Sequence, residues 1–389
     1  MLKGNNTHQG SMKKEIRIGR SLMFIIVPMV FTIYGLVEAK NFLYPLAFGL
    51  LFSYLLFPIA NYLEKKHFPR IIANLVCIIL ALVVLGVGIS FIIEQVENML
   101  GDFPTLKRKA IDNVESLQHN LEDLFGVSSQ NFEIFMKERI NNFFNTGTDL
   151  FRDVFASTTG TIVRLALLPV YIFLFLYYRT KFALFILKIV PRNKQKVTIN
   201  ILRDISTVAS KYMGGVVIVV FILCILNSLG LYIVGFRYPI VLGIISALFN
   251  FIPYFGTLMG GAVPLLFALL IQDPLIAGRV VILFIIIQFI ENNILTPNIV
   301  GGNVKISPFF IIVGLVMAAM IWGIPGMLVI IPFLAILKIV FKNIDELKPY
   351  AFLLSTRGTQ KHSISMKNLR KIGKIFGNFF KKGPVDSRG

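Results

Sequence analysis

The sequence contains few charged residues for its length. Asp, Glu, Lys and Arg make up 15% of the 389 residues, whereas hydrophobic residues make up 56%. A soluble protein of this size would need more polar surface, so the composition excludes a soluble globular protein. Several apolar runs also exceed the roughly 18–20 residues that are needed to span the hydrocarbon of a bilayer. We therefore predict an all-α, polytopic integral membrane protein.

Cysteine and histidine are also rare. Cys77 and Cys224 lie in apolar runs, and we interpret them as small core residues and not as disulfide partners. The four histidines lie outside the apolar runs, which argues against a metal site within the membrane. The H-E-x-x-H, G-x-S-x-G and P-loop motifs are missing as well. We therefore expect no enzyme, no cofactor and no metal, and any active transport would be secondary or depend on a separate partner.

Acidic residues are outnumbered by basic ones, 20 against 39, which gives a net charge of +19. The basic residues cluster in particular segments between the apolar runs, as the positive-inside rule describes. We attribute the charge to orientation in the bilayer and do not expect nucleic-acid binding. The rule places residues 1–20, 65–70, 179–211 and the basic tail 346–389 in the cytoplasm, with the spans in a bacterial cytoplasmic (inner) membrane.

The apolar runs form two membrane regions separated by a polar insert. Residues 21–93 are predicted to contain three spans, and residues 156–345 to form a transport region. Residues 94–155 hold eleven acidic and six basic residues, a net charge of −5 in a basic chain. Apolar residues at helical spacing on both sides of Gly126 predict two amphipathic helices outside the cytoplasm. Counted simply, the chain has about eight transmembrane helices, with both termini cytoplasmic.

Two long apolar segments are interrupted by glycine and proline. Pro239–Ile271 would be about 50 Å long as one straight helix, but the hydrocarbon is only about 30 Å thick. Pro253 and the glycines after it favour a non-helical path, which is tolerated only against protein or a water-filled cavity. Pro308–Ile339 is interrupted in the same way by Gly323–Gly326. Such a pair indicates a transporter binding site, with kinked spans, re-entrant hairpins and simple close packing as open alternatives.

Polar side chains also interrupt the apolar stretch between these two segments. Gln288, Glu291, Asn292 and Asn293 lie directly on it. A charged group at the centre of a transmembrane helix costs on the order of 3 kcal/mol on insertion scales, and such groups usually face a cavity and carry function. Glu291 could therefore bind and release a proton or a cation. Alternatively, Glu291 lies at the membrane interface, because only a short apolar stretch, which begins at Val280, precedes it.

Four stretches of the sequence resemble the autoinducer-2 exporter family of bacterial membrane proteins. They are NFIPYFGTLMGGAVP, QFIENNILTPNIVGGNVKISP, GIPGMLVIIPFLAILKIV and IDELKPYAFLL, and the likeness extends over Ser21–Leu354. The resemblance implies an eight-span fold and a homo-oligomer, with a pentamer favoured. It also implies export of a small polar solute, such as a signalling molecule of quorum sensing. Exchange of sodium or another monovalent cation for protons is a further activity that it implies.

The positions that match the family stretches are the candidate site residues. Glu291 is the candidate for ion coupling. The substrate-binding candidates are Asn250, Pro253, Tyr254, Gly256, Gly260, Gly261, Gln288, Asn292 and Pro297. The leading hypothesis is a secondary transporter that exports a small polar solute, because amide side chains and exposed backbone suit an uncharged ligand. The alternatives are a cation/proton antiporter that uses Glu291, and a non-transporting membrane scaffold that binds partners through its outer helices.

A cysteine probe tests the predicted side of the acidic insert. Ser128→Cys, in a chain whose two native cysteines are replaced, should react with a membrane-impermeant maleimide in intact cells with a permeabilised outer membrane. The reason is that the acidic insert lies outside the cytoplasm while its basic flanks lie inside. Labelling that occurs only after lysis would overturn this topology.

Overall fold

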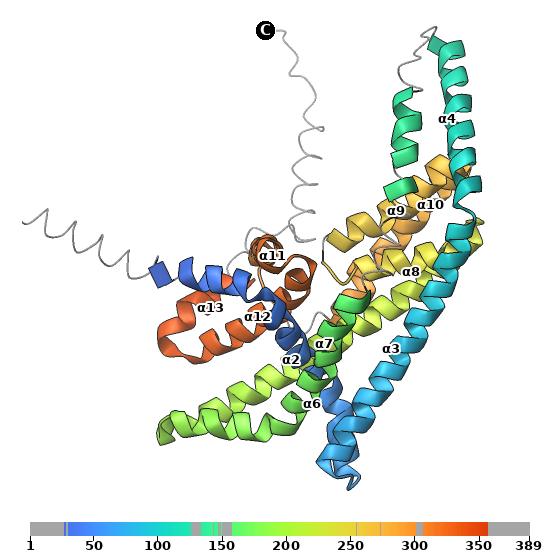
Figure 1. The fold of residues 1–389 in the computed structure, drawn as a ribbon. Coiled ribbons are helices and arrows are strands. Elements are labelled where there is room, and N and C mark those ends of the chain that lie inside the picture. Colours follow the sequence, from blue (N-terminus) through green and yellow to red (C-terminus); the bar gives the residue numbers. More distant parts are fainter. Residues whose placement is uncertain are drawn as a thin grey trace, which may run out of the picture.

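The computed structural model is built from α-helices (Figure 1). It describes residues 27–28, 30–125, 134–142, 144–146, 149, 158–253, 255–272, 274–300 and 306–356. Within these ranges the only extended pairing is an isolated bridge between Ile306 and Ser355, so the predicted all-α class is confirmed. The predictions for residues 1–20, for the loop around Gly126 and for the tail after residue 356 lie outside the described residues.

Six described segments are long and apolar enough to cross a membrane, which confirms a polytopic membrane protein. They lie in α2 (Lys40–Lys65), α3 (Arg70–Gly101), α6 (Thr158–Ile189), α7 (Gln195–Val234) with the short η1 (Arg192–Lys194) before it, α10 (Pro274–Ile290) continued by η2 (Glu291–Val300), and α12 (Ile324–Asn343). A helical stretch over residues 30–38 precedes α2 and belongs to the first predicted span. The start of that span lies outside the described residues.

Shorter helices complete the described fold. They are α4 (Phe103–Phe125), α8 (Pro239–Phe249), α9 (Phe255–Ile271), α11 (Pro308–Trp322), η3 (Asp345–Leu347) and α13 (Lys348–Leu354). α4 belongs to the acidic insert and extends away from the body of the molecule, roughly in line with α3 (Figure 1). A second helical stretch of the insert covers residues 134–142.

The first broken segment folds back on itself instead of continuing as one kinked helix. A Cβ atom on Gly256 would lie 2.5 Å from the Asn250 Cα atom, and one on Gly260 would lie 2.7 Å from the Ser246 carbonyl oxygen. Residues of α9 therefore lie opposite residues of α8 in antiparallel order. Because a side chain at either glycine would collide with backbone, the two helices can approach closely only with glycine there. α8 and α9 form a helical hairpin, the form of the segment that the sequence left open.

The length of α8 indicates how deep the tip of this hairpin would lie in a bilayer. α8 begins after the charged Arg237, and its 11 residues extend about 16 Å at 1.5 Å per residue. The hydrocarbon of a bilayer is about 30 Å thick. A hairpin whose open end is at the bilayer surface therefore has its tip, residues 250–253, at about mid-depth.

The second broken segment is also a helical hairpin, made of α11 and α12. A Cβ atom on Gly326 would collide with the carbonyl oxygen of Ala318, so these helices also approach through glycine. Gly323 forms the turn with φ +67°, a left-handed conformation that favours glycine. Trp322 beside it donates a hydrogen bond of 2.9 Å from Nε1 to the carbonyl oxygen of Leu36. This bond joins the tip of the hairpin to the helix that precedes α2.

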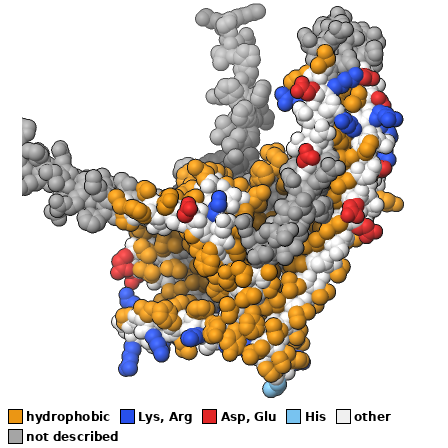
Figure 2. All heavy atoms as spheres, viewed as in Figure 1, with side chains coloured by type: hydrophobic (Ala, Val, Ile, Leu, Met, Phe, Trp, Pro, Cys, Tyr) orange, Lys and Arg blue, Asp and Glu red, His pale blue; other side chains and the backbone are white. Residues whose placement is uncertain are grey.

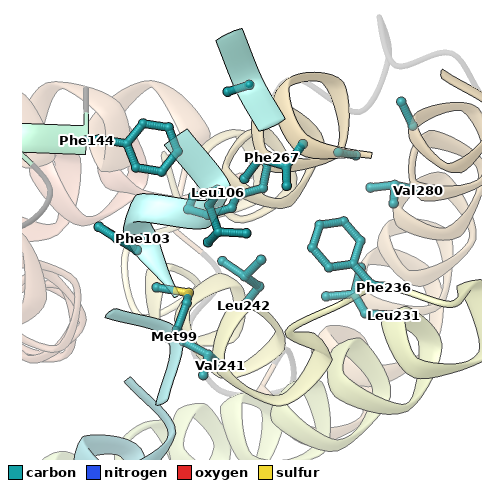
Figure 3. Close-up of a cluster of buried hydrophobic side chains, with 14 of the residues drawn as sticks. Met99, Phe103, Leu106, Phe144, Leu231, Phe236, Val241, Leu242, Phe267 and Val280 are labelled. Carbon is teal, nitrogen blue, oxygen red and sulfur yellow. The ribbon is translucent and has the colours of Figure 1, made fainter. Parts of the chain in front are cut away.

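The open end of the α8–α9 hairpin is packed against the outer helices. The most extensive cluster of buried hydrophobic side chains in the described chain joins α3 and α4 to this end, as Figure 3 shows for Met99, Phe103, Leu106, Phe144, Leu231, Phe236, Val241, Leu242, Phe267 and Val280. Asn113 on α4 donates a hydrogen bond of 3.0 Å to the carbonyl oxygen of Leu270 near the end of α9. The acidic insert is thus attached to the hairpin.

A polar contact connects the same helices at the start of α8. Asp102, between α3 and α4, accepts a hydrogen bond from the Tyr238 hydroxyl and forms an ion pair of 3.2 Å with Arg237. The Tyr238 hydrogen bond, followed by the Arg237 charge, lowers the pKa of Asp102 below its ordinary value. Burial and Asp102 raise the pKa of Tyr238 to about 12. The ionised Asp102 carboxylate therefore stabilises the folded protein at pH values above the ordinary pKa of an aspartate. This stabilisation is lost as the pH falls through the lowered pKa of Asp102.

The contact between α7 and α8 predicts a steric effect on stability. A Cβ atom on Gly243 would lie 2.5 Å from the Ser228 backbone nitrogen. Gly243→Val should therefore destabilise the purified protein by about 1–3 kcal/mol or more, because two helices must separate. The measurement is the midpoint of thermal unfolding in detergent. Gly88→Val on α3 is the matched control, because nothing lies within 4 Å of its Cβ position. Equal midpoints for the two variants would contradict the close approach.

Candidate functional site

The site is built around the turn that connects α8 to α9. The Ile252 N–H donates a hydrogen bond of 3.0 Å to the Phe249 carbonyl oxygen, and the Gly256 N–H donates one of 2.7 Å to the Ile252 carbonyl oxygen. Pro253 has no N–H group, so a helical hydrogen bond is missing at this residue in any case. The chain can therefore reverse direction at the tip with few unpaired backbone donors, which is a requirement at this depth.

A cavity of about 420 Å³ adjoins the tip. Its walls come from α7, the tip, α9, η2, α11 and α12, and the lining residues are Tyr212, Val216, Val219, Val220, Asn250, Pro253, Thr257, Glu291, Asn292, Thr296, Val300, Ile311 and Ile331. This volume is within the usual range for small-molecule sites, which are mostly apolar with a few polar groups. The second hairpin contributes Ile311 and Ile331, so both broken segments border the same cavity.

Glu291 is the single carboxylate among the lining residues. Its side chain is buried, with 8% exposed, and its Oε2 atom accepts a hydrogen bond of 2.9 Å from Gln288 Nε2. Within the part of the chain that the structure describes, no Lys or Arg nitrogen lies within 4.0 Å of this carboxylate. A buried carboxylate without a basic partner is costly when charged, so a proton or a bound cation would stabilise it.

The backbone around Glu291 is irregular. α10 ends at Ile290, and η2, a π-helical segment, begins at Glu291 and contains Pro297. π-helical turns are rare and occur frequently at functional sites. The wider turn and the proline explain why this part of the apolar stretch does not continue as a regular α-helix.

The structure brings four of the predicted site residues together at the cavity. They are Asn250, Pro253, Glu291 and Asn292, and Gln288 reaches the cavity through its hydrogen bond to Glu291. Tyr254 lies outside the described residues.

The remaining predicted positions lie at helix contacts. Gly256 and Gly260 face the backbone of α8, and a Cβ atom on Gly261 would be 3.6 Å from the Phe284 ring of α10, an ordinary contact. Pro297 belongs to η2 and is not among the cavity-lining residues. The glycines therefore shape the hairpin that carries the cavity wall.

Three polar lining residues were not among the sequence predictions. Thr257 and Thr296 lie in the family stretches, next to Gly256 and Pro297 respectively. Their positions beside helix-breaking residues could have identified them as site residues from the sequence. Tyr212, at the start of the apolar run of α7, gives no such signal. Its proximity to the tip depends on how α7 packs against the hairpin.

Comparisons with known proteins identify a family of transporters. The family model described as AI-2E family transporter matches residues 24–346. The Bacillus subtilis protein YrrI is 28% identical over 336 residues, which cover 82% of this chain and 90% of that protein. YueF of the same organism is 25% identical, covering 85% and 90%, and a Borreliella burgdorferi protein is 24% identical, covering 91% and 95%. All three are provisionally named transport proteins, and their names give no substrate.

Two adjacent residues of α9 should differ in their access to water. Thr257 lines the cavity, whereas Leu258 is 67% exposed on the apolar outer surface. In a chain without native cysteines, Thr257→Cys should react with a charged methanethiosulfonate reagent in proteoliposomes, because a thiolate forms only where water enters. Leu258→Cys is the matched control and should remain unmodified in lipid. Equal rates for the two cysteines would show that the cavity does not admit water.

Proposed function

Because the chain belongs to the AI-2E family of transporters, we propose that it is a secondary transporter that exports a small polar solute across a bacterial inner membrane. A signalling molecule of the autoinducer-2 type is one solute of this class. The observation that carries the proposal is the cavity at the tip of the α8–α9 hairpin, where irregular backbone and polar side chains meet. Non-helical backbone within the hydrocarbon is tolerated only in protein or beside a water-filled cavity.

The chemistry of the cavity favours an uncharged ligand. Asn250, Thr257, Asn292 and Thr296 offer amide and hydroxyl groups, and no Lys or Arg is among the lining residues. A hydroxylated solute can exchange hydrogen bonds with such groups, and the valine and isoleucine walls exclude water around it. A strongly anionic solute would find no counter-charge among these residues.

A cation/proton antiporter is the second candidate function, and Glu291 supports it. This carboxylate is buried at the cavity and lacks a basic partner among the described residues, so either a proton or a monovalent cation can neutralise it. Alternate occupancy by the two ions would exchange them across the membrane. The same group could also couple solute export to a cation gradient.

A non-transporting scaffold is the weakest of the three hypotheses. A scaffold needs helices that span the bilayer, but it has no use for two hairpins that converge on a cavity. We further propose that the protein is a homo-oligomer, with a pentamer favoured by the family resemblance, and that both termini are cytoplasmic.

Glu291→Gln distinguishes these functions, because it keeps the shape of the side chain and removes its ionisation. In everted vesicles with a pH-sensitive dye, sodium-dependent collapse of a proton gradient should occur with the wild type and vanish with Glu291→Gln if the protein is an antiporter. If it is an exporter without ion coupling, solute flux should persist with a flattened pH dependence. Glu346→Gln, at an exposed acidic residue beside α13, is the control and should behave as the wild type in both assays.

The solute itself is found by comparing metabolites retained by deletion cells with those released by overexpressing cells. A compound that moves in opposite directions in the two strains is then loaded into proteoliposomes. A wild-type rate and pH profile for Glu291→Gln would show that Glu291 has no part in transport. No flux of any compound, sodium or proton by the wild type would contradict the proposed function and favour the scaffold.

A further inference from the structure

A second concave surface lies where α3 begins beside α6, and it shares no lining residue with the cavity. This groove has a volume of about 530 Å³. Arg70 and Lys181 supply positive charge to it, Tyr178 supplies an aromatic wall, and Ile71 and Leu184 supply apolar walls. Its lining therefore combines cationic and apolar groups, unlike the lining of the cavity at the hairpin tip.

The groove lies at the boundary between the polar and apolar parts of both helices. The apolar run of α3 starts at Ile71, immediately after Arg70, and the apolar run of α6 ends at Tyr178. Arg70 Nη1 donates hydrogen bonds to the Tyr177 carbonyl oxygen at 3.4 Å and to Thr180 Oγ1 at 3.2 Å, so the two boundaries are at one level. Aromatic and basic residues gather in this way at membrane–water interfaces.

Positive charge at the groove exceeds the negative charge available to balance it. Glu64 Oε2 forms an ion pair of 2.5 Å with Arg179 and a longer one of 3.7 Å with Arg70 Nε. The Lys181 ammonium lies 5.5 Å from the centre of the Tyr178 ring, and no described carboxylate lies within 4.0 Å of it. Arg70, Arg179 and Lys181 thus carry three positive charges beside the single negative charge of Glu64, which leaves a net charge of +2 for a ligand.

We propose that this groove binds the headgroup phosphate of an anionic phospholipid, with the acyl chains lying along the apolar start of α3. Arg70 and Lys181 would hold the phosphate, since arginine and lysine are the usual phosphate partners and basic pockets at membrane surfaces bind anionic lipid headgroups. Ile71 and Leu184, which are 48% and 53% exposed, would contact the lipid on either side. Figure 2 shows the broad apolar surface of the body, which lipid chains would contact.

Native mass spectrometry of the full chain in detergent tests this site with phosphatidylglycerol and phosphatidylcholine as probes. The wild type should retain phosphatidylglycerol in preference to phosphatidylcholine. Lys181→Gln should weaken phosphatidylglycerol binding about fivefold, the effect of one basic residue at an anionic surface. Lys188→Gln, two turns further along α6 and outside the groove, should bind as the wild type does. Lys181 forms no ion pair with a described residue, and its contact with the Tyr178 ring lies within α6, so its replacement breaks no ion pair between described helices.

Three results would overturn the proposal. Equal retention of phosphatidylglycerol by Lys181→Gln and Lys188→Gln would remove Lys181 from the site. Equal retention of both lipids by the wild type would show that the excess positive charge does not select an anionic lipid. Displacement of phosphatidylglycerol by millimolar inorganic phosphate would indicate a site for a soluble anion. None of these readouts depends on transport, so they are independent of the proposed function.

Discussion

The cost of leaving backbone polar groups unpaired in hydrocarbon governs this structure. A chain that reverses at mid-depth loses helical hydrogen bonds, and lipid offers no replacement for them. The reversal at residues 250–253 is therefore possible only because α7 and η2 enclose it and a cavity adjoins it. The position of a cavity with polar groups beside the tip agrees with this requirement.

The hairpin is held in place from its open end and along its length. Glycine allows α8 to approach α7 and α9 to approach α8, so the hairpin packs backbone against backbone. At its open end, Asp102 and Asn113 join it to α3 and α4, which belong to the membrane region and the acidic insert. These contacts connect the acidic insert with the hairpin whose tip lines the cavity.

The sequence predicts the helical class and the places where helices break, because both depend on local chemistry. Long apolar runs exceed the thickness of the bilayer, and Pro253 and Gly323 interrupt helices wherever they lie. Whether a broken segment crosses the membrane or turns back depends on the helix opposite Gly256 and Gly260, which local sequence does not specify. Glu291 was recognisable as a polar residue in an apolar stretch.

The opposite walls of the cavity could not be predicted in the same way. Tyr212, Ile311 and Ile331 come from three distant helices and have ordinary apolar or aromatic surroundings in the sequence. They meet the tip only through the packing of α7, α11 and α12. Residues that form a site through long-range packing carry no local signal, whereas residues beside broken backbone do.

The depth of the hairpin tip in a bilayer distinguishes a helical hairpin from a continuous span. A nitroxide attached at Phe251→Cys, in a chain without native cysteines, reports its depth in a bilayer through power saturation with oxygen and a water-soluble nickel complex. If the segment turns back as a hairpin, the nitroxide should lie near the bilayer centre, about 15 Å from the edge of the hydrocarbon. A nitroxide at the level of either headgroup layer would contradict a hairpin that turns back within the bilayer.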